Sequence, residues 1–322
     1  MKSIAERYRR FARQEAAGRS DAYELLAMSV AVPPVVLAFL DSLPAERQQP
    51  NLLFAALRTI VGTPSSAEEL DDAIQTHAGP IADLMLTRTT QTNEPGRCAA
   101  LMPVLARIKG PLALIEVGAS AGLCLLPDVY GYDWGVKRLP SPVCPHASVS
   151  APEFPCKVSD NTPIPHQHPE VVWRAGLDLN PLDVSKDDDV AWLETLVWPE
   201  HDERLRRLRQ AIGVARVHRP RVVAGDLRRD LSALIAEAPA DATVVVFHTA
   251  VLSYVSDCSE RAAFSKRMIN DPRVTWLSNE SPRTFPRIAE VAASDGENMF
   301  LMAVDGRPQA WTGPHGQEIR WI

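Results

Sequence analysis

The stretch that decides the fold is Leu112-Ala113-Leu114-Ile115-Glu116-Val117-Gly118-Ala119-Ser120-Ala121-Gly122. Its first six residues form a short, mostly apolar run, which predicts a central strand buried on both faces. The two glycines allow a tight turn and a close approach of the backbone to a ligand. Residues 121–126 are expected to begin a helix whose free N–H groups face that ligand. The stretch therefore predicts a strand, a turn and a helix around a nucleotide-type ligand.

Three chemistries fit this turn, and the spacing separates them. A dinucleotide fingerprint G-x-G-x-x-G requires glycines at positions 118, 120 and 123, but Ser120 and Leu123 stand there. Residues 118–122 match the hydrolase elbow G-x-S-x-G, which makes Ser120 a candidate nucleophile. The spacing Glu116-x-Gly118-x-x-x-Gly122 resembles the first motif of class I S-adenosylmethionine-dependent methyltransferases. Hydrolase elbows follow several strands, whereas residues 1–108 read as helical, so the order of elements favours the methyltransferase interpretation.

Composition indicates an ordinary globular protein. The 322 residues carry 34 Lys and Arg against 40 Asp and Glu, a formal charge of −6, which provides no basic footprint for nucleic acid. The N-terminal residues lack the apolar core of a signal peptide, and no run reaches the length of a membrane span. The five cysteines are odd in number and scattered. We expect a cytoplasmic protein with a small-molecule substrate and without nucleic-acid or membrane partners; the oligomeric state is left open.

The rest of the chain predicts an α/β protein with a helical N-terminal cap. The cap covers residues 1–108, and residues 109–322 form a doubly wound, Rossmann-like domain. After the key strand, six more strands are expected at 171–177, 221–224, 243–247, 273–277, 299–304 and 318–322. The last two would form an antiparallel hairpin around the turn-rich segment 305–316. The result is a seven-stranded sheet of the methyltransferase type.

A proline-rich insertion at 127–169 interrupts this pattern. We expect an ordered segment that lies over the carboxyl edge of the sheet. It collects potential zinc ligands, but their spacing matches no short-spaced zinc knuckle, so no metal is assigned. These ligands are Cys144, His146, Cys156, His166 and His168.

Two family resemblances follow from these motifs. From Leu112 to Ile322 the chain is similar to class I methyltransferases in strand order and in the context Gly176-x-Asp178-x-x-Pro181. Nearly the whole chain also resembles a bacterial family of unknown function. The stretches shared with that family are 91–94, 116–122, 176–183 and 247–249.

The methyltransferase resemblance implies a cofactor site for S-adenosylmethionine. Gly118, Ser120 and Gly122 would line the methionine end, and Glu116 would lie near the cofactor's amino group. Asp178, at the end of the second strand, would accept hydrogen bonds from the ribose hydroxyls, and Asp226 would lie by the adenine.

The acceptor side has weaker signals. His248 ends the fourth strand, where it could take a proton from the acceptor, with Tyr254 orienting the ring. Asn279 and Glu280 end the fifth strand. The polar loop before the key strand could bring substrate-binding residues to the same pocket: Asn93, Glu94 and Arg97.

Two alternatives remain open. A serine hydrolase would pair Ser120 with a later acid, Asp295 or Asp305, and with His315. A methyltransferase-like protein that has lost catalysis would instead serve as a binding module.

Overall fold

The computed structural model describes residues 3–31, 34–91, 93–143, 150–292 and 298–322. Within it the chain divides into two compact units. The first unit comprises Met1–Thr92 and Asp187–Arg206, and the second comprises Asn93–Lys186 and Arg207–Ile322. The first unit therefore includes a short segment from the middle of the chain, residues 187–206. Residues 93–108, which the sequence analysis placed with the helical cap, belong to the second unit.

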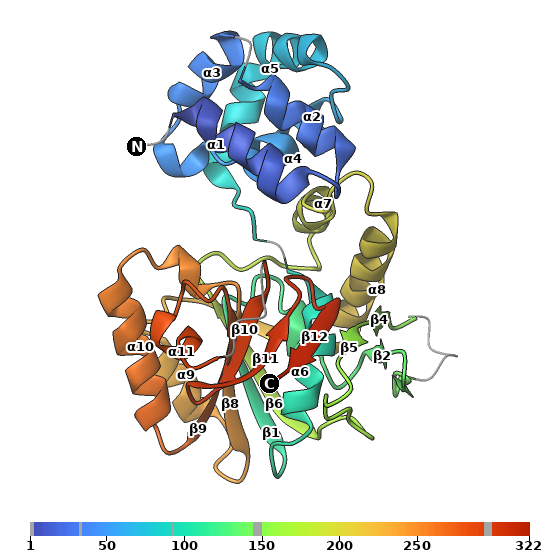
Figure 1. The fold of residues 1–322 in the computed structure, drawn as a ribbon, viewed down its shortest axis with the longest axis vertical. Helices are drawn as coiled ribbons and strands as arrows, with labels where there is room; N and C mark the ends of the chain where they lie inside the picture. The colour runs from blue at the N-terminus through green and yellow to red at the C-terminus, as the bar shows by residue number, and fades with distance from the viewer. Residues whose placement is uncertain (1–2, 32–33, 92, 144–149, 293–297) are drawn as a thin grey trace. The chain divides into compact units, whose positions relative to one another are not determined.

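The first unit is helical (Figure 1). Its α-helices are α1 Ile4–Phe11, α2 Asp21–Ser29, α3 Pro34–Asp41, α4 Pro50–Ile60, α5 Ala67–Thr87 and α7 Asp187–Thr195, and α8 Asp202–His218 begins in it. Phe54 of α4 lies in an aromatic core, with its ring centroid 4.9 Å from that of Tyr23 and 6.0 Å from that of Tyr8. Helices α7 and α8 are separated by residues 196–201, which include Pro199.

The second unit is built on a large, mostly parallel sheet (Figure 1). Among the described residues nine strands form it, in the order β5-β12-β11-β10-β9-β8-β1-β6-β7. Five adjacent strands are parallel to one another: β7 Arg221–Ala224, β6 Val171–Asp178, β1 Leu112–Val117, β8 Thr243–Thr249 and β9 Val274–Glu280. The other strands are β10 Phe300–Val304, β11 Arg307–Thr312, β12 Glu318–Trp321 and β5 Lys157–Val158. The prediction of an α/β fold is thus confirmed, whereas the predicted seven strands are replaced by a mixed nine-stranded sheet.

The C-terminal hairpin differs from the prediction. Strand β11 lies inside the segment expected to be only turns, and it pairs antiparallel with both β10 and β12. Asp305 and Gly306 form the turn before β11 with φ values of 48° and 75°. Positive φ at both residues of an Asp-Gly pair is the signature of a tight hairpin turn. Pro308 lies next to a register shift in β11, where a missing N–H is tolerated.

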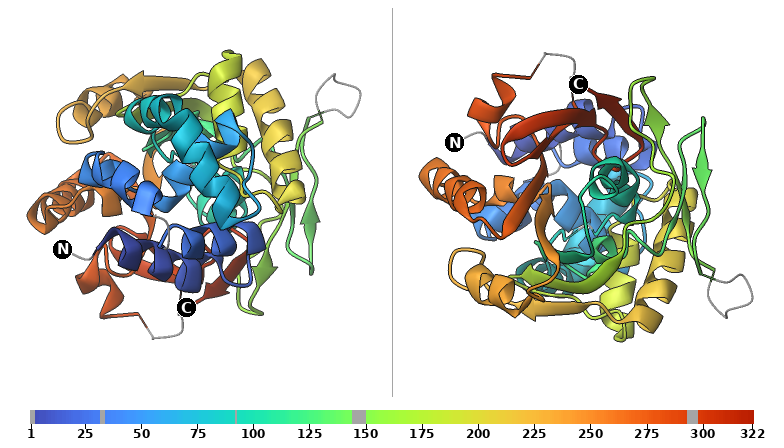
Figure 2. Two further views of the ribbon diagram at one scale, coloured as in Figure 1. Left: turned by 90° about the horizontal axis from the view of Figure 1, so that it is seen from above. Right: turned by 90° about the horizontal axis from the view of Figure 1, so that it is seen from below.

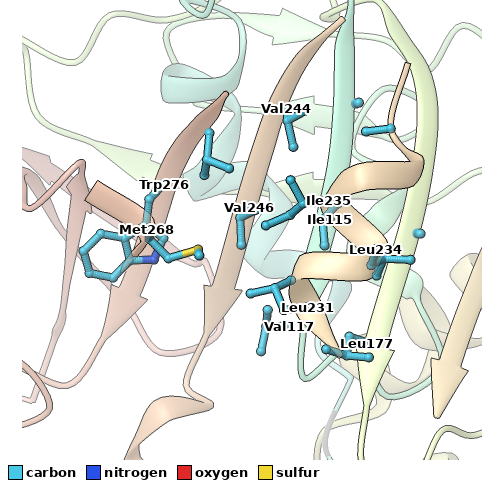
Figure 3. Packing of buried hydrophobic residues seen from close by; sticks show 14 of the residues in the cluster. Ile115, Val117, Leu177, Leu231, Leu234, Ile235, Val244, Val246, Met268 and Trp276 are labelled. Atoms are coloured by element: carbon cyan, nitrogen blue, oxygen red, sulfur yellow. The ribbon is translucent and has the colours of Figure 1, made fainter. Parts of the chain in front are cut away.

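The core of the second unit lies between the parallel strands and two helices (Figure 3). Ile115, Val117 and Leu177 of the sheet pack against Leu231 and Leu234 of helix α9. The two helices that cover this face of the sheet are α9 Leu231–Glu237 and α10 Cys258–Asn270. Because side chains alternate along a strand, the neighbours of Ile115 in β1, including Glu116, point to the opposite face.

Helix α6 Cys98–Leu105 covers that opposite face. The right-hand view of Figure 2 shows the sheet curving around α6, while α10 lies outside the curve. All eight residues of α6 are buried. The helix is therefore enclosed by the sheet and by the insertion, whose Trp134 donates a hydrogen bond to the Ala99 carbonyl over 3.1 Å.

The described part of the insertion is built into the second unit. It forms a small sheet of β2 Gly131–Asp133, β3 Arg138–Leu139 and β4 Glu153–Pro155, and it supplies the edge strand β5. Figure 2 shows β2 and β4 beside the later part of α8 in both views. The insertion's Tyr130 hydroxyl donates to the Leu123 carbonyl over 2.8 Å, just after the turn that ends β1, while β5 lies at the edge of the sheet. The expected position over the carboxyl edge of the sheet stays a prediction for the insertion as a whole.

Candidate functional site

The candidate site lies at the carboxyl ends of β1, β6 and β8. From β1 the chain adds β6 and β7 on one side of the sheet, and then β8 and β9 on the other. The boundary between β1 and β8 is therefore a topological switch point. In open α/β sheets, ligands bind in the crevice outside the strand ends at such a point.

The glycine turn after β1 has the expected backbone but not the expected helix. Gly118, Ser120 and Gly122 have φ values of 73°, 51° and 74°. The turn continues into a single 3-10 turn, η4 Leu123–Leu125, in place of an α-helix. The prediction of a helix is wrong, because Pro127 disfavours the helical conformation at the residue before it and stops the helix after one turn.

The glycines are required by the packing of the chain itself. A Cβ at Gly118 would lie 2.5 Å from Cγ2 of Val251, and one at Gly122 would lie 3.0 Å from Cγ2 of Val222. A Cβ at Gly176 of β6 would lie 2.4 Å from that of Ala119. The expectation that the two turn glycines leave room for a ligand is therefore not met at their Cα atoms, where neighbouring side chains fill the space.

Asp178 holds the turn against the end of β6. It is 7% exposed, and its carboxylate accepts hydrogen bonds from the backbone N–H groups of Ser120 and Asn180, each over 2.8 Å. Ser120, although strained, is thus fixed through its backbone. The two sequence-predicted residues are brought together, as expected for a site at the ends of neighbouring parallel strands.

Glu116 is the most unusual group at this edge. It is 2% exposed, and its Oε2 is buried without a hydrogen-bond partner among the described residues. Burial raises the pKa of its carboxyl group well above the usual value, the Cys124 thiol raises it further, and the Arg97 guanidinium lowers it. Asn279 Nδ2 and Glu280 Oε2 are likewise buried and without partners in the described part of the chain. Three atoms of this rare kind therefore lie at the carboxyl ends of two strands.

The polar loop before α6 reaches the same edge through 3-10 turn η3 Pro95–Arg97. Asn93 Oδ1 accepts from the Leu123 N–H over 2.8 Å, and so fixes η4. Arg97 donates to the Thr249 carbonyl over 3.0 Å and to the Pro314 carbonyl over 2.9 Å. Glu94, 6% exposed, accepts from the Gly96 N–H. The structure thus joins this loop to the ends of β8 and β11.

His248 is a buried structural group in this structure. Its Nδ1 lies 2.7 Å from Glu280 Oε1, and its Nε2 accepts from the Trp276 indole over 3.0 Å. Tyr254, 71% exposed in the turn η5 Leu252–Tyr254, does not orient the ring. Since both ring nitrogens bond to protein, His248 cannot take a proton from a substrate in this arrangement.

Two other predicted residues have partners of their own. Asp226 is bound by Arg228, whose hydrogen bonds lower the pKa of the Asp226 carboxyl to about 2. Asn279 Oδ1 accepts from the Thr312 hydroxyl over 2.7 Å. Thr249, Thr312 and Trp276 were not predicted, because their roles depend on partners from strands distant in sequence.

The structure does not bring Asp305 and His315 together, as a hydrolase triad with Ser120 would require. Asp305 precedes β11, and its Oδ1 accepts from the backbone N–H of Trp276. His315 lies beyond the other end of β11. His315 Nδ1 instead lies 3.7 Å from Glu94 Oε2. Asp295 lies outside the described residues.

No metal cluster is formed in the described part of the chain, where no three His, Cys, Asp or Glu residues are arranged to hold an ion. Cys144 and His146 of the insertion lie outside that part. Among its helices, none alone is long and apolar enough to cross a membrane, and only α2 and α3 taken together meet that criterion.

The fold and this edge define an α/β protein whose mostly parallel sheet carries buried carboxyl groups at its strand ends. The chain belongs to a family described as an uncharacterized protein conserved in bacteria (DUF2332), which matches residues 5–321. Searches of curated proteins and of solved structures find no match.

Proposed function

We propose that the protein is a methyltransferase that binds S-adenosylmethionine at the carboxyl ends of β1 and β6. The observation that carries this proposal is the unpartnered, buried Oε2 of Glu116 at the switch point. A buried acceptor without a partner costs about 1–3 kcal/mol, and more when it is charged. A ligand that donates a hydrogen bond or a positive charge would offset that cost.

S-adenosylmethionine carries hydrogen-bond donors and a positive charge that the acidic groups at this edge can bind. Its methionine end carries an ammonium group, which suits the Glu116 carboxylate. Its ribose carries two hydroxyls, which suit Asp178 at the end of the neighbouring strand. When bound, the cofactor supplies an electrophilic methyl group, and the protein must align the acceptor with it.

Backbone strain supports the same location. Ser120 and Ala250 have φ values of 51° and 58°, although neither is a glycine. Ser120 follows β1 and Ala250 follows β8, so both lie beside the switch point. Non-glycine residues in this region cost on the order of 1–3 kcal/mol each and are concentrated at ligand sites.

The bonding of His248 changes the acceptor side of the proposal. Because Trp276 and Glu280 engage its ring, no proton is assigned to it, and the proposal requires an acceptor that is already deprotonated or loses its proton to water.

The test is calorimetric titration with S-adenosylmethionine and S-adenosylhomocysteine. We expect micromolar binding, on the order of −8 kcal/mol, to the wild type and a loss of at least about tenfold in Glu116→Gln. Glu280→Gln is a matched control, since Glu280 is also 2% exposed and has an unpartnered Oε2, but points to the face of α10. It should bind the cofactor as the wild type does.

A second readout separates a ligand contact from a structural role. The raised pKa of Glu116 favours the protonated carboxyl group in the free protein, whereas an ammonium group beside it would favour the carboxylate. Titrations in buffers of different ionisation enthalpy should show proton release that Glu116→Gln abolishes. Absence of binding to either ligand would reject the proposed function.

A further inference from the structure

A second candidate site lies at the end of β9, on the face of the sheet opposite to Glu116. It is a small cavity of about 10 Å³ between β9, β10 and the short helix α11 Pro286–Ala289. Its lining residues are Ser278, Glu280, Ser281, Pro282, Phe285, Ile288 and Leu301. A cavity of about this size holds a group as large as one water molecule.

Glu280 is the charged residue of the lining. Its Oε1 accepts from three donors: His248 Nδ1 over 2.7 Å, and the N–H groups of Val251 and Leu252 over 2.8 and 3.0 Å. These contacts fix the orientation of the carboxyl group. Its Oε2 has no hydrogen-bond partner among the described residues, although the side chain is only 2% exposed.

The surroundings leave the charge of Glu280 without a counterion. His248 Nε2 accepts the Trp276 N–H, so the proton of a neutral ring lies on Nδ1 and is the one donated to Glu280. No arginine or lysine forms an ion pair with Glu280 in the described ranges. A buried carboxylate without a cation is unfavourable, and a cation that reaches Oε2 would stabilise it.

The walls of the cavity select the kind of cation. Four of the seven lining residues are apolar, and the remaining oxygens are too few for a metal ion that prefers six or more oxygen ligands. A primary ammonium group fits better. Its N–H groups can donate hydrogen bonds to Oε2. Its first carbon can pack against Ile288 and Leu301, and the ammonium can form a cation–π interaction with the Phe285 ring.

We propose that this cavity binds the primary ammonium group of a small alkylamine or of an amine-bearing ligand, with Glu280 as its acceptor. The proposal goes beyond the cofactor site. It involves no S-adenosylmethionine, and it stands or falls independently of the methyltransferase assignment.

Saturation-transfer NMR with n-propylammonium chloride tests the proposal on the full chain. The propyl protons should receive saturation from the wild type, and the titrated affinity should fall at least about tenfold in Glu280→Gln. Tetramethylammonium, which has the same charge but no N–H group, should not compete.

Two further variants distinguish binding in the cavity from binding to the acidic surface of the protein. Leu301→Phe fills the cavity but keeps the carboxylate and its three donors, so it should also abolish binding without disturbing the segment after β8. Glu290→Gln changes an exposed carboxylate next to α11 and should leave binding unchanged. Equal binding by the wild type and Glu280→Gln, or competition by tetramethylammonium, would assign the signal to the acidic surface and overturn the proposal. No signal with the wild type would mean that the cavity holds water only, which overturns it as well.

Discussion

Glu116 is expected to make the free protein less stable as the pH rises. Burial raises the pKa of its carboxyl group on folding. A group with a raised folded-state pKa contributes stability below its unfolded-state pKa, and that stability is lost as the pH rises through the folded-state value. Glu116→Gln removes the ionisable group, so the variant should be more stable than the wild type at high pH.

Urea denaturation of both proteins at about pH 4.5 and about pH 8.5, on either side of neutrality, measures this effect. The advantage of Glu116→Gln in the free energy of unfolding should grow between the two values. A difference that does not change with pH would show that Glu116 does not have a raised pKa. The same substitution should weaken cofactor binding, so that a gain in stability accompanies a loss of function.

At the scale of elements, the glycine turn makes a prediction about packing. Gly118→Ala must place a Cβ at a φ of 73° and also against Val251. Gly135 has nearly the same φ, 74°, but nothing lies within 4 Å of its Cβ position. Gly135→Ala should therefore cost only the backbone term, about 1–2 kcal/mol.

Gly118→Ala should cost about 1–3 kcal/mol more than Gly135→Ala, because the added methyl overlaps Val251. Denaturant unfolding of the two variants gives the difference directly. Adding Val251→Ala to Gly118→Ala should recover part of this excess. If the two glycine variants are equally destabilised, Val251 does not limit the space beside the turn.

The elements that were predictable are those whose signal is local. Strand β1 begins and ends as predicted because an apolar run is bounded by glycines on both sides. Strand β11 is harder to predict, because the hairpin signal Asp305-Gly306 lies within a longer segment that is rich in turn-forming residues. The helix expected after Gly122 is replaced by one 3-10 turn because Pro127 disfavours the helical conformation at Leu126.

The site was predictable only in part, for a related reason. Glu116, Ser120 and Asp178 could be placed together because the carboxyl ends of neighbouring parallel strands meet at one edge. The bonding of His248 could not be predicted, since its partners Trp276 and Glu280 come from a strand that follows it by about thirty residues. The packing of Val251 on Gly118 likewise depends on tertiary structure.

At the scale of the whole molecule, the two units predict where the chain can be cut. Residues 93–108 carry Asn93, Arg97 and the fully buried α6, all of which belong to the second unit. Residues 187–206 belong to the first unit, where the Trp192 indole donates to the Thr89 carbonyl over 2.9 Å. A second unit that folds alone should therefore begin at residue 93 and lack residues 187–206.

We expect residues 93–322, with 187–206 replaced by a Gly/Ser linker of equal length, to unfold cooperatively in urea. The matched fragment 109–322 with the same replacement should not, since it loses α6. Near-UV circular dichroism and the sharpness of the urea transition compare the two fragments. Cooperative unfolding of the shorter fragment would contradict this division of the chain.

The interrupted first unit also has a consequence during translation. A nascent chain cannot complete this unit when residue 92 leaves the ribosome, because α7 and the start of α8 are still to be made. At about 5–20 residues per second, the missing segment is complete after roughly 6–23 s. For that time the surface of α4 that α7 will cover is open to chaperones and to other nascent chains, while the second unit is already being synthesised. Slow or paused ribosomes between codons 93 and 206 should therefore lower the yield of the protein more than pauses placed later.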